Sequence, residues 1–339
     1  MRYLITAAVT LFAALAGPGA RAGEKAEAIL DQHVLPGMRL LAERTADLDA
    51  TAQVDCAPKS EDLRAAYGAA FDAWISVSHL RFGPAETDTR GFALAFWPDT
   101  RSMTPKTLRA MIAAADPAVD TPESFATVSV AGRGFYALEY LLYDPAFTSD
   151  ETADYSCRLV RAIAVDIARN AAALEADWRQ SYADKMRHPS AEGPYQSEEE
   201  VLQEFFKALV TDLEVDADMR LGRPMGQIDK PRPTRAEVRR SGRSLRHVVL
   251  SLTALRQLSD LLSADDAGLS TRMDKDFDYA LSRADKLSDD PALAGVATPQ
   301  GRIRIESLQQ AIRAVRADAN QFMGPTLGVA AGFNSLDGD

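Results

Sequence analysis

Histidine, cysteine and tryptophan are scarce in this chain, which has four histidines, two cysteines and three tryptophans among its 339 residues. No two histidines lie one helical turn apart, so the HExxH pattern of zinc peptidases is absent. The cysteines do not have the spacing of a zinc-thiolate site. The sequence also lacks a G-x-S-x-G elbow, a phosphate-binding glycine loop and a dinucleotide-binding glycine pattern. The commonest sequence signatures of hydrolases, nucleotide-binding proteins and dehydrogenases are therefore missing.

The chain has fewer basic than acidic residues: it contains 38 Lys and Arg and 49 Asp and Glu, which gives a formal net charge of −11. Nucleic-acid binding depends on clustered Lys and Arg that neutralise phosphates. The densest basic cluster, residues 232–246, alternates with a helix-type apolar pattern and is interpreted as the solvated face of a helix. We therefore expect no nucleic-acid partner.

Long apolar runs are missing as well. No stretch after residue 16 approaches the ~20 apolar residues that a transmembrane helix needs, so we expect no membrane-spanning segment. The beginning of the chain is typical of a secretory signal: Met1 and Arg2 supply the positive start, residues 4–16 the short apolar core, and residues 20–22 a small-residue cleavage site. We expect cleavage near Ala22 and export of the mature chain to the periplasm or cell envelope.

The two cysteines, Cys56 and Cys157, both lie downstream of the predicted signal. In an oxidising compartment they can form a disulfide, which would close a loop of about 100 residues. Two free thiols are the alternative. The residues alone favour the bridge.

Alternating patterns typical of β-strands are absent, and apolar residues recur with the helical period of 3.6 throughout, so we expect an all-α fold. The chain is longer than a typical single domain, which suggests two packed helical bundles. The Pro- and Gly-containing segment 188–194 is the candidate boundary. We therefore predict a signal peptide at 1–22, an N-terminal bundle at 23–190 and a C-terminal bundle at 195–339. The expected helices cover residues 24–44, 60–81, 105–115, 150–187, 197–213, 234–262, 271–285 and 302–322.

One acid stands inside an apolar helical run in the segment Val130–Tyr143. Glu139 lies three residues after Tyr136, so the phenol and the carboxylate share a helix face. Two interpretations are open. A hydrogen bond between Tyr136 and Glu139 would satisfy a partly buried acid, and the residues alone favour this structural interpretation. Alternatively, the pair belongs to a ligand site.

Several other polar residues have structural interpretations of their own. His33 falls on the apolar face of the first expected helix and is interpreted as a satisfied core histidine. Arg81 precedes Gly83 and Pro84 at the expected end of a helix, where a cation complements the helix dipole. Asp99 lies in a long connection, residues 85–107, of the kind that is more often functional than idle. Thr234 and Glu237 have the spacing of a capping box.

Taken together, several stretches resemble the imelysin-like family of bacterial envelope proteins. These stretches are Trp74 to Pro84, Phe96 to Asp99, Gly134 to Tyr143, Pro233 to Leu245 and Leu327 to Asp339. The resemblance covers nearly the whole mature chain. It implies two helical bundles packed together with a site between them.

The family was named for peptidases, and its relatives include iron-regulated envelope proteins and the periplasmic component of an iron-uptake system. Its hallmark is G-x-H-x-x-E. Gly134 and Glu139 match that motif, but Tyr136 stands at the histidine position. Imidazole is the ligand that borderline divalent metals prefer, so this departure argues against metal-dependent hydrolysis. A phenolate and a carboxylate are hard oxygen donors that suit ferric iron, and we expect Tyr136 and Glu139 as metal ligands.

The resemblance therefore implies a periplasmic binding protein linked to iron uptake or handling, with a metal ion or small ligand, and envelope transport components, as partners. His33, Arg81 and Asp99 are the residues expected to complete the site. A metal-dependent peptidase is one alternative. A protein that binds a peptide or polysaccharide, in which Glu139 only pairs with an arginine such as Arg81, is the other.

Overall fold

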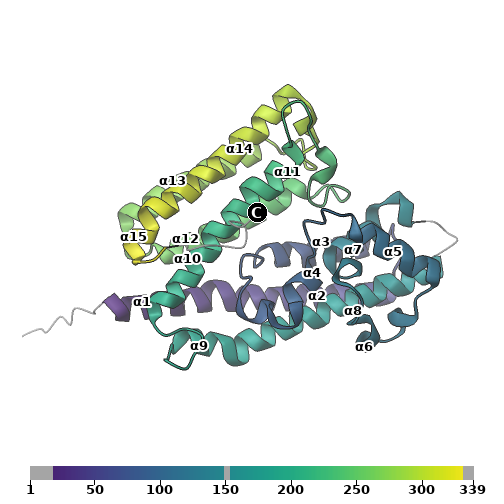
Figure 1. The fold of residues 1–339 in the computed structure, drawn as a ribbon, viewed down its shortest axis with the longest axis horizontal. Coiled ribbons are helices and arrows are strands. Elements are labelled where there is room, and N and C mark those ends of the chain that lie inside the picture. Colours follow the sequence, from purple (N-terminus) through teal and green to yellow (C-terminus); the bar gives the residue numbers. More distant parts are fainter. Residues whose placement is uncertain (1–17, 149–152, 331–339) are drawn as a thin grey trace, which may run out of the picture.

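The computed structural model describes residues 18–148 and 153–330, and within these ranges the chain is helical with no β-strand (Figure 1). The all-α prediction is therefore confirmed. The α-helices are α1 (Pro18–Ile29), α2 (Leu35–Val54), α3 (Glu61–Ile75), α4 (Arg90–Leu94), α5 (Met103–Ala114), α6 (Pro122–Phe125), α7 (Gly134–Tyr143), α8 (Ala153–Asp177), α9 (Ala183–Arg187), α10 (Glu198–Glu214), α11 (Gly222–Met225), α12 (Ser244–Leu262), α13 (Ala267–Asp285), α14 (Pro299–Asp318) and α15 (Gly324–Leu327).

Four π-helical turns extend these helices: η1 (Leu30–Val34), η8 (Trp178–Tyr182), η9 (Val215–Leu221) and η12 (Ala319–Met323). Short 3₁₀ turns lie at η2 (Gly83–Ala85), η3 (Thr87–Thr89), η4 (Pro117–Asp120), η5 (Val130–Gly132), η6 (Pro145–Phe147), η10 (Pro233–Arg235) and η11 (Ala294–Ala297).

The first helix is longer than the sequence pattern predicts. α1, η1 and α2 form one helical rod from Pro18 to Val54, and Pro36 lies in the first turn of α2, where a missing N–H is tolerated. The predicted end at Arg44 is wrong, because Leu48 and Ala52 are buried and continue the apolar face. The next helix, α3, also differs from its prediction, since it ends at Ile75 and not at residue 81.

One group of helices forms around α2 and α8, which lie side by side and are joined by α3 and α7 (Figure 1). Aromatic side chains fill the space between α3 and α7: the rings of Phe71 and Phe135 stack with centroids 4.5 Å apart, and Tyr67 meets Phe71 edge to face. All three side chains are fully buried. Burial of each aromatic side chain contributes roughly 1.5–3 kcal/mol, so this cluster fixes how α7 sits on α3.

A second group contains α10, α12, α13 and α14, which pack against one another. α10 begins as predicted, because Ser197 caps it and its hydroxyl accepts from the backbone N–H of Glu200 at 3.3 Å. The predicted boundary at residues 188–194 falls in the turn between α9 and α10. α1 crosses to this second group and packs against α10 and α12. The division into two domains stays a prediction.

Only part of the sequence that bears on export, the predicted signal at residues 1–22, lies within the described residues. Among the described residues, no helix is both long and apolar enough to cross a membrane. Most of the predicted signal, residues 1–17, lies outside the described part of the chain.

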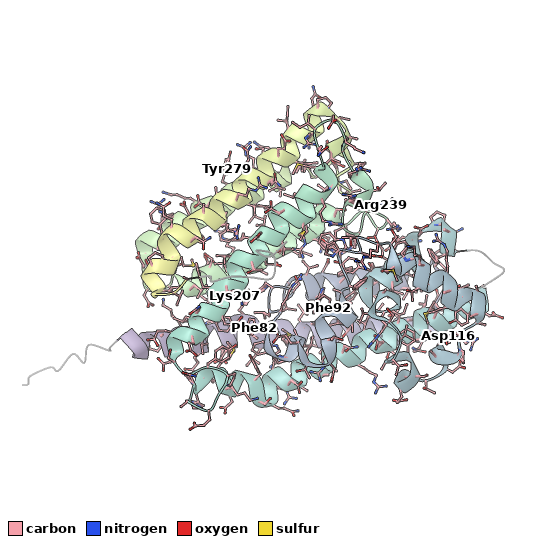
Figure 2. The ribbon with its side chains drawn as sticks, in the orientation of Figure 1. Phe82, Phe92, Asp116, Lys207, Arg239 and Tyr279 are labelled. Carbon is pink, nitrogen blue, oxygen red and sulfur yellow. A yellow bond between two sulfur atoms is a disulfide. The ribbon has the colours of Figure 1, made fainter. Side chains whose placement is uncertain are left out.

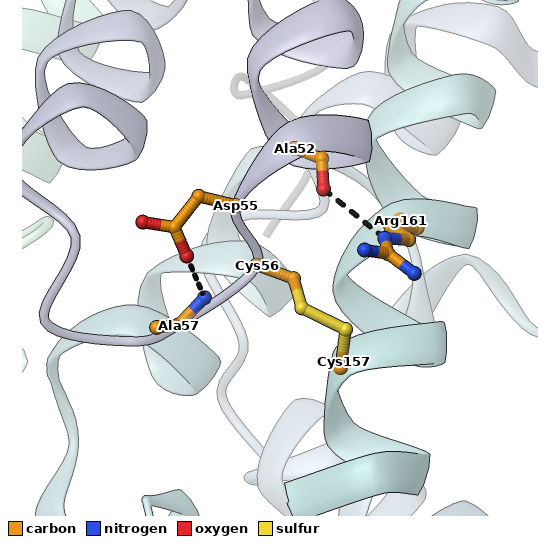
Figure 3. Close-up of a disulfide and its surroundings, with 6 residues drawn as sticks. All are labelled: Ala52, Asp55, Cys56, Ala57, Cys157 and Arg161. Atoms are coloured by element: carbon orange, nitrogen blue, oxygen red, sulfur yellow. Dashed lines mark hydrogen bonds between the residues drawn. A yellow bond between two sulfur atoms is a disulfide. The ribbon is translucent and has the colours of Figure 1, made fainter.

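The predicted disulfide is confirmed: Cys56, just after α2, is bonded to Cys157 on α8, with Cα atoms 5.2 Å apart (Figure 3). Arg161, one turn further along α8, donates from Nε to the carbonyl of Ala52 at 3.2 Å. The bridge and this hydrogen bond together hold the end of α2 against α8.

We predict that replacing both cysteines by serine lowers the free energy of unfolding by about 2–5 kcal/mol, because the bridge closes a long loop and restricts the unfolded chain. The loop spans a sequence separation of 101 residues. Denaturant unfolding of the parent and of the Cys56→Ser/Cys157→Ser variant measures the difference. Reductant should shift the parent curve and leave the variant curve in place. Alkylation of two thiols in the parent without reductant would contradict the bridge.

Candidate functional site

The site is built on the first turn of α7. Gly134 has φ of +73°, and a Cβ at this position would lie 2.3 Å from the carbonyl oxygens of Ala93 and Leu94. Only glycine tolerates both the backbone angle and this close approach. Just before it, the Arg133 guanidinium forms a buried two-point ion pair with Asp166 on α8, at 2.9 and 2.6 Å. These constraints fix the direction in which α7 leaves the loop.

Tyr136 and Glu139 are both buried on α7, but they do not bond to each other. The Tyr136 hydroxyl donates to Oε1 of Glu237, far along the chain. Glu139 Oε1 instead accepts from the backbone N–H and the hydroxyl of Ser241, both at 3.0 Å. The Tyr136–Glu139 hydrogen bond favoured from the residues alone is therefore wrong, because each side chain finds its partner in the segment before α12.

A pocket of about 400 Å³ opens beside these two residues. Asp99 lines it as well, so three of the five residues predicted for the site are brought together. The Asp99 carboxylate caps α5, accepting from the backbone N–H groups of Met103 and Thr104 at 2.8 Å each. We call this space the Tyr136 pocket. It is lined by Phe96, Trp97, Asp99, Thr100, Ser102, Thr104, Tyr136, Glu139, Tyr140, Arg223, Thr234, Arg235, Ala236, Val238 and Arg240.

Some of the charged side chains that line this pocket have ion-pair partners and others do not. Arg240 donates to Asp144 at 2.6 Å and lies 3.9 Å from Glu139. By contrast, Arg223 and Arg235 have no carboxylate within 4.0 Å among the described residues. Burial, and then the positive charge of Arg235, lower the pKa of Arg223. The charge left without a partner in the pocket is therefore positive.

A buried ion network, which the sequence patterns did not reveal, lies behind the pocket. Arg220, on the π-turn η9, donates to Glu237 at 3.0 Å and to Asp216 at 2.5 Å. Asp212 lies 3.6 Å from Arg220, and His247 Nδ1 lies 3.3 Å from Glu237. All five side chains are at most 3% exposed. Thr234 lies in the short 3₁₀ turn η10 and residues 236–243 are irregular, so the predicted capping box is wrong and Glu237 points into the core.

Two acids of this network, Glu237 and Asp216, have very different pKa values. Burial would raise the pKa of Glu237, but Arg220, His247 and Tyr136 outweigh it and hold that pKa at about 2. Burial raises the pKa of Asp216 to about 7, against the pull of Arg220 and with the repulsion of Asp212. For Tyr136, burial and then the negative charge of Glu237 raise the pKa well above its usual range, so the phenol keeps its proton.

The remaining two predicted residues lie elsewhere. His33, on η1, bonds to His79, and Arg81 lies in the turn after α3. Arg81 is not in a helical last turn, so its expected role in complementing a helix dipole is wrong. Its Nε donates to the carbonyl of Ser78 at 3.0 Å, and its side chain lines a different cavity.

The fold and the α7 motif identify the relatives of this chain. The model of the family described as Imelysin matches residues 34–319, which is most of the sequence. The chain belongs to the imelysin family. The segment Gly134–Glu139 lies within the matched residues.

Two solved structures share the fold of this imelysin-family chain. An imelysin-like protein from Psychrobacter arcticum 273-4 superimposes with a TM-score of 0.76 at 19% identity, over 92% of this chain and 97% of that one. A putative iron-regulated protein A precursor from Parabacteroides distasonis ATCC 8503 gives a TM-score of 0.68 at 13% identity, over 90% and 97%. The search of curated proteins gives no match.

We predict that Asp216→Asn makes the slope of the free energy of unfolding against pH more positive between about pH 4 and pH 7. In the unfolded chain an aspartate ionises near ~3.9, whereas Asp216 in the folded chain ionises at about 7. Between these values Asp216 binds a proton in the folded state only, so its contribution to the free energy of unfolding falls as the pH rises, by up to about 1.4 kcal/mol per unit. Asparagine removes this contribution. The buried histidines His33, His79 and His247, whose pKa values are lowered by burial, contribute with the opposite sign in both proteins.

Urea unfolding at a series of pH values measures the slope. Because Glu237 changes its charge only at lower pH, it does not contribute in the upper part of the window. Asp218→Asn, on the same π-turn but with a 44% exposed side chain, is the matched control. Parallel curves for the parent and Asp216→Asn would show that Asp216 carries no extra proton.

Proposed function

We propose that this imelysin-family chain is an exported binding protein that handles iron, and that it takes iron as a small anionic chelate in the Tyr136 pocket. The observation that carries the proposal is the unpaired positive charge of Arg223 and Arg235 beside acids that already have partners. An anion of the citrate class, carrying ferric iron, supplies the negative charge that these guanidinium groups lack.

The aromatic wall of the pocket supports the same class of ligand. The rings of Trp97 and Tyr136 are nearly parallel, with centroids 6.4 Å apart, and the Arg223 guanidinium lies 5.9 Å from the Trp97 ring. A flat guanidinium held over an aromatic face is preorganised for two-point contact with a carboxylate.

Direct coordination of a bare ferric ion by Tyr136 and Glu139 fits the same residues less well. The Tyr136 hydroxyl is committed to Glu237, and one Glu139 oxygen is held by Ser241. No group of three His, Cys, Asp or Glu side chains that could hold a metal ion occurs in residues 18–148 and 153–330. A bare ion would therefore have to break existing bonds, whereas a chelate brings its own ligands. The same shortage of metal ligands speaks against the peptidase alternative.

Two further observations are consistent with export and with a connection to iron. The disulfide between Cys56 and Cys157 suits an oxidising compartment, and residues 1–22 have the composition of a secretory signal. One of the two structural relatives is described as an iron-regulated protein.

The test is calorimetric titration of the mature protein with ferric citrate. We expect a single site that weakens by about tenfold or more in Arg223→Gln, because a charge-assisted hydrogen bond contributes roughly 1.5–3 kcal/mol. Arg169→Gln, which removes an arginine that pairs with Glu123 on the surface, should bind as the parent does. Iron-free citrate shows how much of the affinity comes from the anion alone.

Glu139→Gln distinguishes the two ways of holding iron. If Glu139 is a direct metal ligand, the loss of its charge weakens binding strongly. For an anionic chelate, the loss of a negative charge beside the pocket leaves binding equal or tighter. Absence of binding heat in the parent protein would overturn the proposed function.

A further inference from the structure

A second cavity of about 260 Å³ lies between α10 and the turn that follows α3, and it shares no lining residue with the Tyr136 pocket. Figure 2 labels two of its residues, Lys207 on α10 and Phe82 after α3. It is lined by His79, Arg81, Phe82, Glu86, Glu204, Lys207, Ala208, Thr211, Asp212 and Val215. We call it the His79 cavity.

A chain of hydrogen bonds fixes the tautomer of His79. The amide nitrogen of Gln257 donates to the carbonyl of Gln32 at 3.0 Å, which orients the Gln257 oxygen toward Nδ1 of His33, also at 3.0 Å. His33 Nδ1 therefore carries the hydrogen, and His33 Nε2 is an acceptor. The 2.8 Å contact between the two Nε2 atoms then requires the hydrogen on Nε2 of His79. His79 Nδ1 is left with a bare lone pair.

Two polar atoms of residues that line this cavity lack partners. His79 is only 4% exposed, and its Nδ1 atom is buried without a hydrogen bond. The Thr211 hydroxyl, on α10, is buried and unpaired in the same way. Buried polar groups are paired in the large majority of cases, and a buried group without a partner costs about 1–3 kcal/mol. The two atoms together indicate a place for a ligand that donates a hydrogen bond to His79.

Four charged side chains around the cavity are also left without ion-pair partners. Glu204, Lys207 and Thr211 lie on one face of α10. Arg81 and Glu86 face them from the turns after α3. Neither the two cations nor the two carboxylates have an oppositely charged group within 4.0 Å among the described residues. Arg81 and Glu86 are exposed to solvent, whereas Glu204 and Lys207 are partly buried. The partly buried pair still leaves one charge of each sign in the cavity wall, which matches a ligand that itself carries both signs.

An apolar cavity adjoins this polar one. It has a volume of about 430 Å³ and shares Arg81 and Glu86 with the His79 cavity. Its other lining residues are Trp74, Ala85, Thr89, Gly91, Phe92 and Ala95. The Phe92 side chain is 60% exposed and forms part of the apolar wall of this cavity. A ligand whose ionic groups sit in the His79 cavity can therefore place an apolar side chain here, past Arg81 and Glu86.

From this geometry we infer a second ligand site, which binds a small zwitterion of the amino-acid class with an apolar side chain. The ammonium group donates to His79 Nδ1 and pairs with Glu204, and the carboxylate pairs with Lys207 and Arg81. This inference does not rest on the proposed function, because the two sites share no residue.

Titration with L-leucine and with the dipeptide L-leucyl-L-leucine tests the site and separates a free amino acid from a peptide end. We expect one of the two to bind, and to bind at least about tenfold more tightly than 4-methylpentanoate or isopentylamine, each of which carries only one of the two charges. Lys207→Gln should weaken binding by a similar factor. Lys275→Gln, on the exposed face of α13, is the matched control.

The Thr211→Val variant tests whether the Thr211 hydroxyl contacts the ligand or has only a structural role. Because the hydroxyl has no partner in the protein, its removal should leave the melting temperature unchanged or raise it, yet weaken binding severalfold. Nitrogen NMR of the histidine rings should show His79 with hydrogen on Nε2, and the Nδ1 resonance should move when the ligand is added. If neither zwitterion binds at millimolar concentration, or if binding leaves Nδ1 unmoved, the inference is overturned.

Discussion

Glu237 is the charge on which the arrangement of the molecule depends. It accepts from Tyr136 of α7 and from Arg220 of η9, and both partners are buried with it. The neighbouring Ser241 and Arg240 hold Glu139 and Asp144 in the same way. A short irregular segment thus fastens α7 to the helices that follow residue 195. Removal of one partner from such a buried pair leaves an uncompensated charge, which typically costs 3–5 kcal/mol, so the segment cannot shift independently of α7.

The same network lies between two cavities of different character. Tyr136, at one end, lines a pocket with aromatic walls and unpaired arginines. Asp212, at the other end, lines a cavity with unpaired charges of both signs. The acids between them are not equivalent, since Glu237 is held ionised and Asp216 holds a proton near neutral pH. With Asp216 neutral, Arg220 faces two carboxylates, those of Glu237 and Asp212. The network therefore buries less negative charge than it would if all three of its acids were ionised.

Helical periodicity predicted the fold class because burial of an apolar face repeats every 3.6 residues. The α7 motif drew attention to Tyr136 and Glu139, and both line one pocket with Asp99, a residue of a separate segment that the motif does not include. Local sequence patterns gave wrong predictions where contacts between residues far apart in the sequence determine the structure. Thr234 and Glu237 have capping-box spacing, yet Glu237 is drawn into the core by Arg220, a partner that no spacing rule links to it. His33 was correctly expected to face inward. Its neighbour His79 comes from a different segment, the turn after α3, so no spacing rule links the two histidines.

The π-turn η1 contains one residue more than an α-helical turn would. Each residue of an α-helix advances the chain by about 100° around the axis, so this single residue sets which side of the rod upstream of it faces α10 and α12. Related chains that lack it would present α1 rotated by that angle. In an alignment with such a chain, a one-residue gap would belong within this unbroken helix, and an alignment that forbids it would misplace His33 and every residue before it.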